Sequence, residues 1–481
     1  MTYRLVAAKS VLAVALTPRL ALAASPQDDH ITHIEAGLTP TVQVRGRTVA
    51  PHTLAEEMAL HHIPSFSVAV VDQGRIVWAK AYGLADVETA RPATTRTLYE
   101  AGSNSKPVTA SAAVQMAQEG RLGLDRPVND QLKSWRIPDS AFTQGHPVTV
   151  REVLTHTAGL TVSGFGGYAA GAPLPSVVQI LEGKPPANTP AVVVDQTPGG
   201  AWRYSGGGYV ILQLLLGDLE GRGFPELMRT RVLSPVGMTA SAYDQPLPQA
   251  RAGEAATGYR SDGKPIDGRF HVYPELAPAG LWSTPSDLAR WVIALERAYN
   301  GEPSPLTSQA SARAMLTPGL GKFGMGIAIL SNADGVLLGH GGSDLGFKSE
   351  FFGWTKGEHA MVVMANGEDA MPVVEMLVQA VAHEYGWKGL EPKILEMAPL
   401  TDNQRGQFVG SWGHGSLLIS AEGGRLVGKA FGRSFELVPQ DADRLALANG
   451  VPIEFYMAVR GADGRIRALT VNPETTLDRD P

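Results

Sequence analysis

The chain has 481 residues, of which 44% are hydrophobic and 18% are charged, and this balance excludes wholesale disorder. Its formal net charge of −6 argues against a general nucleic-acid binder, which would need a basic face. The absence of cysteine excludes disulfides, iron–sulfur clusters, cysteine-based zinc sites and a cysteine nucleophile.

The first 23 residues have the pattern of an export signal. Arg4 and Lys9 give a positively charged start, an apolar run follows over residues 10–16, and residues 21–23 form an A-x-A site. This order is typical of a secretory signal peptide and predicts a periplasmic or secreted protein. The alternative is an uncleaved leader. No later stretch reaches about 18 uninterrupted apolar residues, so the sequence predicts no membrane span.

The segment after the signal, residues 24–50, is polar and is expected to be a loose linker. Residues 54–62 then predict a short amphipathic helix. Two apolar runs at residues 65–71 and 76–82 flank a glycine-bearing turn and predict a β-hairpin. Residues 107–119 predict a helix, because proline is tolerated in the first turn and a glycine follows the last residue.

The middle of the chain, residues 120–320, is mostly helix and loop. Residues 161–200 are rich in Gly, Pro and Ala and predict long loops. Residues 210–219 and 286–298 carry apolar patterns that predict helices, the second with Ser286 as its N-cap.

Strand patterns return after this helical region and are followed by a helix. Strands at both ends of a helical middle predict an antiparallel sheet built from both chain ends, flanked by helices, with a helical region inserted. The expected class is therefore α+β, in a domain covering residues 51–390. The later strands are expected at residues 326–330, 335–338, 348–352 and 360–364, and the helix at 371–385.

A second unit is expected at the C-terminus. Residues 391–400 contain two prolines and predict a linker. Residues 401–481 show short strands at hairpin spacing, which predicts a small all-β barrel or sandwich. Residues 410–412 (Gly-Ser-Trp) resemble the G-x-W of lipocalin-like barrels. Because the unit is short for eight strands around a ligand cavity, a packing role is favoured over a role in shaping the substrate site.

Ser103 and Lys106 carry the strongest chemical signal. Side chains at i and i+3 of a helix lie on one face, so the Ser103 hydroxyl would lie beside the Lys106 amine. A serine becomes a nucleophile only beside a base, and a lysine is a base only when burial or positive charge lowers its pKa. The spacing alone is weak evidence, since Ser261 and Lys264 share it. That pair lies in a turn-like segment and is expected to be a solvated loop.

Several ordered segments strengthen the interpretation. Together they resemble the class C branch of the serine β-lactamase and penicillin-binding-protein superfamily, which includes class C β-lactamases, DD-peptidases, D-aminopeptidases and esterases. The resemblance spans residues 55–390. It rests on residues 100–110 (EAGSNSKPVTA), 154–160 (LTHTAGL), 202–209 (WRYSGGGY), 233–239 (LSPVGMT), 280–287 (GLWSTPSD) and 340–347 (HGGSDLGF).

The resemblance implies a role for each matching residue. Ser103 would be the acylated nucleophile, Lys106 would help take its proton, and Tyr204 would be a second acid/base that acts as a base in the positive field of Lys106. The backbone N–H groups of Ser103 and Ser343 would form the oxyanion hole. His340, Gly341 and Gly342 would be the strand edge that faces the substrate. Within the 154–160 segment, His156 is expected to bond to the backbone.

Two departures from the family pattern favour an ester or a small-amide substrate over a β-lactam. Gly206 stands where the second motif usually has Asn, so an amide contact to the substrate and to the lysine is missing. Restoring the amide with Gly206→Asn is expected to favour amide over ester substrates. His340 stands where many β-lactamases carry Lys, and a neutral histidine recognises a carboxylate more weakly than a fixed cation does.

The sequence therefore predicts an exported serine hydrolase, a carboxylesterase acting on small acyl esters. A D-amino-acid peptidase (DD-carboxypeptidase or D-aminopeptidase) or a weak β-lactamase is the first alternative. A catalytically silent binding protein that uses the same cleft is the second. No cofactor and no metal are implied. The expected partner is a small-molecule ester or short peptide, with no nucleic acid.

Overall fold

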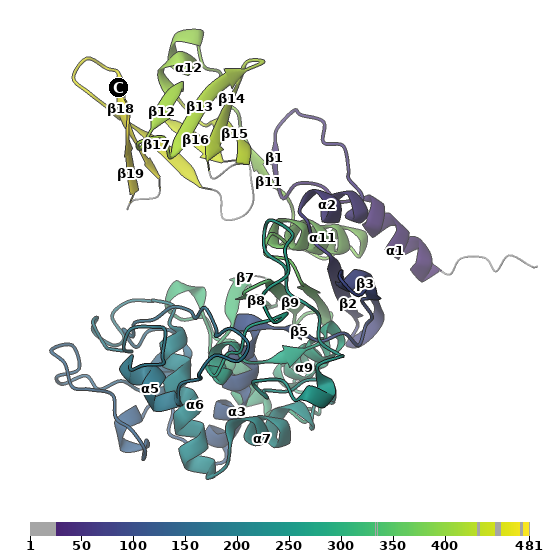
Figure 1. Cartoon of the computed structure of the whole chain (residues 1–481), viewed down its shortest axis with the longest axis vertical. Coiled ribbons are helices and arrows are strands. Elements are labelled where there is room, and N and C mark those ends of the chain that lie inside the picture. The colour runs from purple at the N-terminus through teal and green to yellow at the C-terminus, as the bar shows by residue number, and fades with distance from the viewer. Residues whose placement is uncertain are drawn as a thin grey trace, which may run out of the picture.

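The computed structural model of the chain describes residues 26–331, 333, 335–430, 433–447, 454–471 and 475–480. The predicted signal peptide lies outside the described residues. Figure 1 shows a large part built of sheet and helices and a smaller all-β part above it. Among the residues that the structure describes, no helix is long and apolar enough to cross a membrane.

A seven-stranded antiparallel sheet, in the order β4-β3-β2-β10-β9-β8-β7, forms the centre of the large part. The N-terminal hairpin joins the later strands through β2 and β10, where Val68 lies opposite Val363. The predicted sheet from both chain ends, and with it the α+β class, is confirmed. Its strands are β2 (Ser65–Asp72), β3 (Arg75–Asp86), β4 (Arg91–Pro92), β7 (Ala328–Ser331), β8 (Leu337–Asp344), β9 (Phe347–Trp354) and β10 (His359–Ala365).

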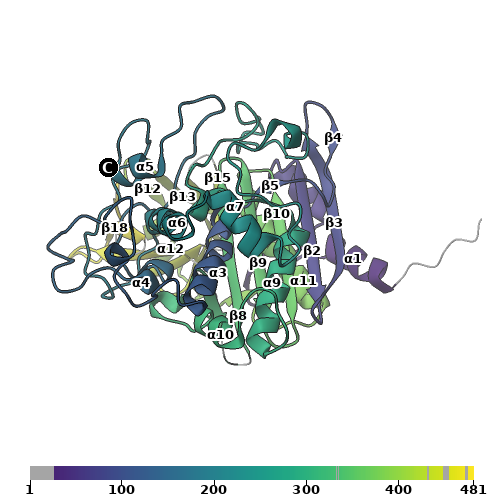
Figure 2. The same ribbon diagram turned by 90° about the horizontal axis from the view of Figure 1, so that it is seen from below.

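Helices cover both faces of this sheet, because successive strand residues point to opposite sides. In β2, Ala69 and Val71 belong to the core shared with α3 and α9, whereas Val68 and Val70 belong to the core shared with α1, α2 and α11. Figure 2 shows α3 and α9 in front of the strands. The covering helices are α1 (Pro26–Ala36), α2 (Leu54–Leu60), α3 (Ser105–Gln118), α9 (Pro285–Asn300) and α11 (Met371–Glu384).

The inserted region is helical, as predicted. Its central helix α6 (Gly206–Glu220) is apolar and largely buried, and the long loops of residues 161–200 contain only the short helix α5 (Val177–Glu182). The remaining elements of the large part are short. They are β5 (Tyr99–Glu100), β6 (Trp282–Ser283), α4 (Val150–Leu154), α7 (Phe224–Met228), α8 (Leu276–Ala279), α10 (Gln309–Met315) and the helical turns η1 (Gly102–Asn104), η2 (Val128–Asp130), η3 (Arg229–Leu233), η4 (Gln249–Arg251) and η5 (Leu320–Lys322).

Regular structure occurs within both segments that were expected to be linkers, and the expectation that residues 24–50 form a loose segment is wrong. Within residues 24–50, α1 packs on α11, with Ile34 buried and His30 Nδ1 2.7 Å from Glu384 Oε1. Within residues 391–400, β11 (Lys393–Leu395) pairs in parallel with β1 (Val42–Val44). These elements are stabilised by tertiary contacts with distant segments, which a local apolar pattern does not reveal. The division into units at 51–390 and 401–481 stays a prediction.

The N-cap of helix α9 lies two residues earlier than expected. Its N-cap is Thr284, whose side chain accepts a hydrogen bond from the backbone N–H of Asp287, and not Ser286. Pro285 explains the difference, because proline is favoured at the first helical position and has no N–H to lose.

The C-terminal part is a small eight-stranded antiparallel barrel in sequence order, nearly closed by a bridge between Trp412 and Arg479. Its interior is filled by side chains such as Phe408, Trp412 and Leu437. Eight strands fit because each has only three to seven residues. The elements are α12 (Asp402–Phe408), β12 (Gly410–Trp412), β13 (Leu417–Glu422), β14 (Arg425–Ala430), β15 (Arg433–Pro439), β16 (Arg444–Leu447), β17 (Phe455–Arg460), β18 (Ile466–Val471) and β19 (Thr475–Asp478).

The strands β1 and β11 join the barrel to the large part (Figure 1). Val42 and Val44 of β1 pack with Val438 and Ala446 of the barrel in one buried cluster. Arg47 donates to both carboxylate oxygens of Glu436 at 2.7 Å. The barrel is therefore held by an apolar contact with a bidentate ion pair at its rim.

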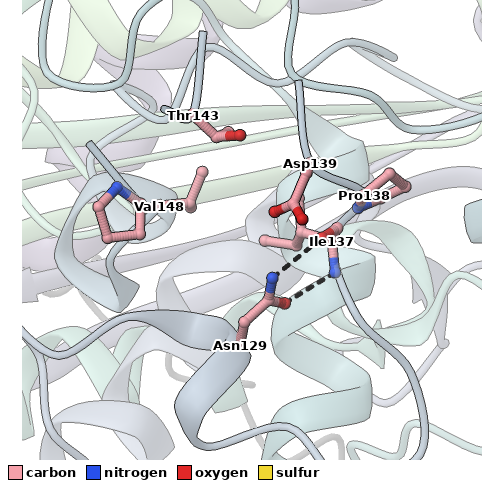
Figure 3. A pocket seen from close by; sticks show the side chains of 7 residues that line it. Asn129, Ile137, Pro138, Asp139, Thr143 and Val148 are labelled. Atoms are coloured by element: carbon pink, nitrogen blue, oxygen red, sulfur yellow. Dashed lines mark hydrogen bonds between the residues drawn. The ribbon is translucent and has the colours of Figure 1, made fainter. Parts of the chain in front are cut away.

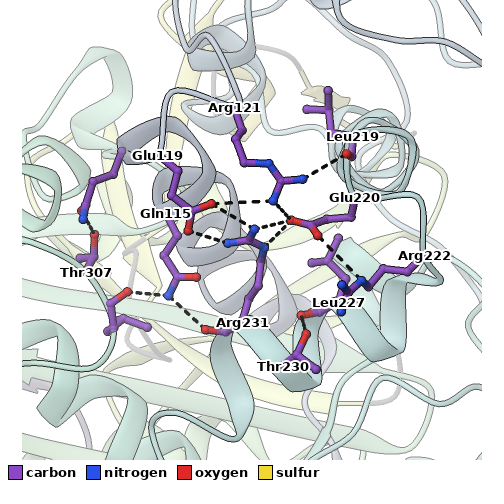
Figure 4. A network of polar contacts seen from close by, with 12 residues as sticks. Gln115, Glu119, Arg121, Leu219, Glu220, Arg222, Leu227, Thr230, Arg231 and Thr307 are labelled. Carbon is purple, nitrogen blue, oxygen red and sulfur yellow. Dashed lines mark hydrogen bonds and ion pairs between the residues drawn. The ribbon is translucent and has the colours of Figure 1, made fainter.

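A network of charged side chains connects the ends of three helical elements (Figure 4). Arg231 of η3 donates to Glu119 after α3 at 2.9 Å and to Glu220 at the end of α6 at 2.6 Å. Arg121 also donates to Glu220, at 2.7 Å. The Glu220 side chain is only 7% exposed, so the arginines, and not water, stabilise its charged form.

Replacing Arg231 by methionine is expected to lower the free energy of unfolding by about 2 kcal/mol, because the largely buried carboxylate of Glu220 loses one of its two close cationic partners. Arg222→Met is the matched control: Arg222 is 45% exposed and lies 3.8 Å from Glu220. Thermal denaturation of both variants measures the effect, and equal stability of the two would contradict this account of the network.

Candidate active site

The nucleophile segment turns sharply before α3. Ser103 lies in the turn η1 and is partly exposed, while Lys106 lies in the first turn of α3 and is buried. Gly102 has φ +52°, and a Cβ on it would lie 2.6 Å from the backbone nitrogen of Ser343. Glycine is required here because the turn is left-handed and passes against β8. This close approach places Ser103 beside β8, the strand whose edge is expected to face the substrate.

Lys106 is arranged as a base for Ser103. Its Nζ donates to Ser103 Oγ at 2.8 Å and to the carbonyl oxygen of Pro278 at 3.0 Å. Burial lowers the pKa of Lys106 to about 7, against the opposing charge of Asp344. At neutral pH a substantial fraction of the amine is therefore unprotonated and able to take the serine proton.

Tyr204 lies on the other side of the same serine. Lys106 Nζ is 4.8 Å from the centre of the Tyr204 ring, and the Tyr204 hydroxyl is 3.5 Å from His340 Nε2. Burial raises the pKa of Tyr204, against a smaller effect of its hydrogen bond with Ser103. The phenol is therefore protonated at neutral pH and can donate a proton, which is the acid half of the acid/base role that the family resemblance implies.

His340 is buried and neutral. Burial and the nearby Lys106 lower its pKa to about 3. Its Nδ1 is 2.7 Å from the carbonyl oxygen of Gly341, so Nδ1 carries the proton and donates. This tautomer leaves Nε2 as an acceptor for the Tyr204 hydroxyl, which orients the phenol.

The strand edge at His340 is open. The edge strand β7 pairs only with residues 337–339 of β8, so residues 340–343 have no strand partner on that side. An open edge offers backbone groups to an extended ligand. On the other side, Ser349 Oγ of β9 donates to Ala101 O and accepts from Asn104 Nδ2, both at 2.8 Å, which fixes the nucleophile turn to the sheet.

A cleft of about 380 Å³ lies over these residues. It brings together most of the residues that the sequence singled out, with Lys106 buried beneath it. Phe323, Ala328 and Met371 complete its wall and were missed, since nothing local in the sequence marks them. The lining residues are Ser103, Tyr204, Phe323, Ala328, His340, Gly341, Gly342, Ser343 and Met371.

Gly206 lies beneath a loop. Its backbone nitrogen donates to Ser163 O at 3.1 Å, and a Cβ on it would lie 2.8 Å from Phe165 Cε2 and 3.0 Å from Ser163 O. Phe165 thus fills space that an Asn side chain would need.

His156, as expected, bonds to the backbone. Its Nδ1 accepts a hydrogen bond from Ser205 N at 3.1 Å, and the centre of its ring lies 4.3 Å from that of Tyr204.

Three buried carboxyl groups, one of which acts on Lys106 through its charge, were also missed. Burial raises the pKa of Asp344 to about 8 and that of Glu275 to about 7. Burial and Asp344 together raise the pKa of Glu100 well above its usual range. The raised pKa values favour the protonated form of each carboxyl group, and protonation of Asp344 weakens its stabilisation of the Lys106 ammonium. Within the described ranges, no cluster of three or more His, Asp or Glu side chains could hold a metal ion.

A second pocket is too small to be a substrate site. Asn129 in this pocket bonds to both backbone groups of Ile137 (Figure 3), which closes the loop. Its volume of about 40 Å³ suits ordered water only.

Comparison with known proteins agrees with this geometry. The model of the family described as Beta-lactamase matches residues 51–384. Protein flp of Staphylococcus aureus (strain NCTC 8325 / PS 47) is 26% identical over 371 residues, which cover 72% of this chain and 68% of flp.

Two solved structures share the fold. The octameric penicillin-binding protein homologue from Pyrococcus abyssi superposes with a TM-score of 0.57 and 21% identity, covering 88% of this chain and 97% of that chain. The D-alanine carboxypeptidase AmpC from Burkholderia cenocepacia superposes with a TM-score of 0.55 and 23% identity, covering 75% and 99%.

Proposed function

The chain belongs to the beta-lactamase family, and on this premise we propose that it is an exported serine hydrolase that acts on small acyl esters through an acyl-Ser103 intermediate. One observation carries the proposal: the hydroxyl of a partly exposed serine lies 2.8 Å from a buried lysine amine whose pKa is lowered to about 7. Export rests on the signal pattern of residues 1–23 and stays a prediction.

Acylation begins with a proton transfer from Ser103 Oγ to the neutral amine of Lys106. Oγ then attacks the ester carbonyl carbon, and the negative charge that develops on the carbonyl oxygen is stabilised by the backbone N–H groups of Ser103 and Ser343. As the carbon–oxygen bond to the alcohol breaks, the Tyr204 hydroxyl donates its proton to the leaving oxygen. The ammonium of Lys106 returns a proton to Tyr204, and both groups are reset.

Deacylation uses the same groups with water as the nucleophile. Lys106, neutral again, takes a proton from a water that attacks the acyl carbon. The bond from carbon to Ser103 Oγ then breaks, and Oγ takes the proton back from Lys106. Splitting one hydrolysis into two such steps lowers the barrier of each.

Two features of the cleft support an ester. Gly206 provides no amide for a peptide-like side chain, and Phe165 occupies that region. His340 is neutral, so the third motif offers no fixed cation for a β-lactam carboxylate. Esters also need less help than amides, because an alkoxide leaves more readily than the anion of an amine.

A D-amino-acid peptidase is the main alternative. The open edge of β8 at residues 340–343 suits an extended peptide backbone, and the similar Burkholderia cenocepacia structure is named a D-alanine carboxypeptidase. A binding protein without turnover would use the same cleft.

Steady-state rates on p-nitrophenyl butyrate, a D-alanyl-D-alanine peptide and a chromogenic β-lactam test these alternatives on the full chain. The proposal predicts that the ester has the largest kcat/KM. Hydrolysis of the peptide without hydrolysis of the ester would select the peptidase. Saturable binding of a substrate with no turnover of any would select the binding protein.

The Gly206→Asn variant is expected to be destabilised by about 1–3 kcal/mol and not to gain amide activity, because the added side chain overlaps Phe165 and a fixed carbonyl. This replaces the expectation from the sequence that the variant favours amides. The double variant with Phe165→Ala makes room and is expected to recover stability and to raise the amide-to-ester ratio. Thermal midpoints and the two rates check this, and an unchanged midpoint for Gly206→Asn would contradict it.

A further inference from the structure

A large cleft away from the catalytic site is lined by three arginines. Its volume is about 760 Å³, twice that of the cleft over Ser103, and the two clefts share no lining residue. It lies where β4, at the edge of the sheet (Figure 2), meets the segments around residues 239–240 and 249–254. The lining consists of Arg91, Pro92, Thr94, Arg96, Thr97, Thr239, Ala240, Arg251, Gly253 and Glu254.

The arginine side chains are positioned by backbone carbonyl groups. Arg91 Nη2 donates to Ala255 O at 2.5 Å. Arg251 Nη2 donates to Ala240 O at 2.6 Å and to Glu254 Oε2 at 2.8 Å. A guanidinium has five N–H donors, so each of these groups keeps donors for a ligand. Two of the three cations are thus held in place before any ligand arrives, which reduces the entropy lost on binding.

The charge of the cleft is not balanced by its own residues. Three guanidinium groups and a single carboxylate, that of Glu254, line it, so positive charge is in excess by two. Glu254 is paired with Arg251, and among the described residues no ion pair involves Arg91 or Arg96. The nearest acidic neighbour along the sheet, Asp86, faces Arg269 and two threonine hydroxyls instead.

This local excess stands out in a chain with a net charge of −6. Fixed guanidinium groups that converge in a cleft favour oxyanions, because their paired N–H groups match the oxygen atoms of phosphate and carboxylate. Threonine hydroxyls at residues 94, 97 and 239 add neutral donors to the same wall.

We propose that the cleft of Arg91, Arg96 and Arg251 is a second, non-catalytic binding site for a small molecule that carries more than one phosphate or carboxylate group. A cleft of about 760 Å³ with three arginines in its lining has room for a ligand larger than a single inorganic ion. The site lies outside the catalytic residues, so ester hydrolysis does not depend on its arginines.

Isothermal titration calorimetry of the full chain with inorganic phosphate, pyrophosphate and citrate, at matched ionic strength, tests the proposal. We expect pyrophosphate or citrate to bind more tightly than phosphate, since each can engage two guanidinium groups. Tighter binding of pyrophosphate than of citrate would assign a phosphorylated ligand, and the reverse order a polycarboxylate.

Arg96→Gln is the informative variant, because the exposed Arg96 side chain takes part in no ion pair with described residues. It is expected to weaken binding about tenfold and to leave the rate on p-nitrophenyl butyrate unchanged. Arg126→Gln, at an exposed arginine elsewhere, is the control and should bind as the wild type does. No saturable binding by the wild type, or equal affinities of wild type and Arg96→Gln, would overturn the proposal.

Discussion

Replacing Ser103 by alanine is expected to lower kcat/KM on p-nitrophenyl butyrate by about 10³-fold or more, because no acyl-enzyme can form without Oγ. The fold should be unaffected, since the side chain is partly exposed and its loss opens no cavity in the core. Initial rates of the two proteins, with background hydrolysis subtracted, measure the effect.

The chain supplies its own control for this variant. Ser261 and Lys264 have the same spacing, but Ser261 Oγ lies 3.1 Å from Asp369 Oδ1, and Lys264 Nζ lies 2.6 Å from Asp262. Ser261→Ala should keep full activity. Equal loss in both serine variants, or none in Ser103→Ala, would show that Ser103 is not the nucleophile.

The Lys106→Met variant is expected to lose about 10²- to 10⁴-fold in kcat/KM, the usual contribution of a positioned general base. Methionine fills the buried site without a charge and leaves the hydroxyl of Ser103 without its acceptor for the proton. Circular dichroism and thermal midpoints establish that the variant is folded, and the same rate measurement gives the loss. The exposed Lys264→Met is the control.

The pH dependence tests the same group in the wild type. Only the unprotonated amine of Lys106 accepts the serine proton, and burial lowers its pKa to about 7. The kcat/KM is therefore low at pH 5, rises through half of its maximum near pH 7 and levels off above pH 8. A flat profile across this range would contradict the assignment of Lys106 as the base.

Much of the fold was predictable because its signals are local. The hairpin of β2 and β3 and the strands β9 and β10 follow apolar patterns, and α3 is marked by a proline in its first turn and a glycine after its end. These signals depend on neighbouring residues alone. Helix α1 and strand β1 carry no such pattern, and they are ordered by contacts with α11 and β11, more than 300 residues later in the chain. Only the three-dimensional structure could reveal them.

In the candidate site, too, some features were predictable from the sequence and others were not. Ser103 and Lys106 were predictable because one helical turn brings them together, and Tyr204, His340 and Ser343 because of the family pattern around them. The protonation states were not, since they depend on burial by distant segments. The Pro278 carbonyl that holds Lys106 belongs to the short helix α8, and the Phe165 ring that covers Gly206 belongs to a loop. No local pattern in the sequence specifies where either segment lies.

The central claim is the covalent acyl-Ser103 intermediate, and mass spectrometry of the acid-quenched wild-type protein tests it most directly. After brief reaction with p-nitrophenyl butyrate, the account predicts a mass increase of one butyryl group, on the peptide that contains Ser103 and absent from Ser103→Ala. A butyryl group on another residue, or ester turnover with no covalent adduct even on the millisecond timescale, would contradict it.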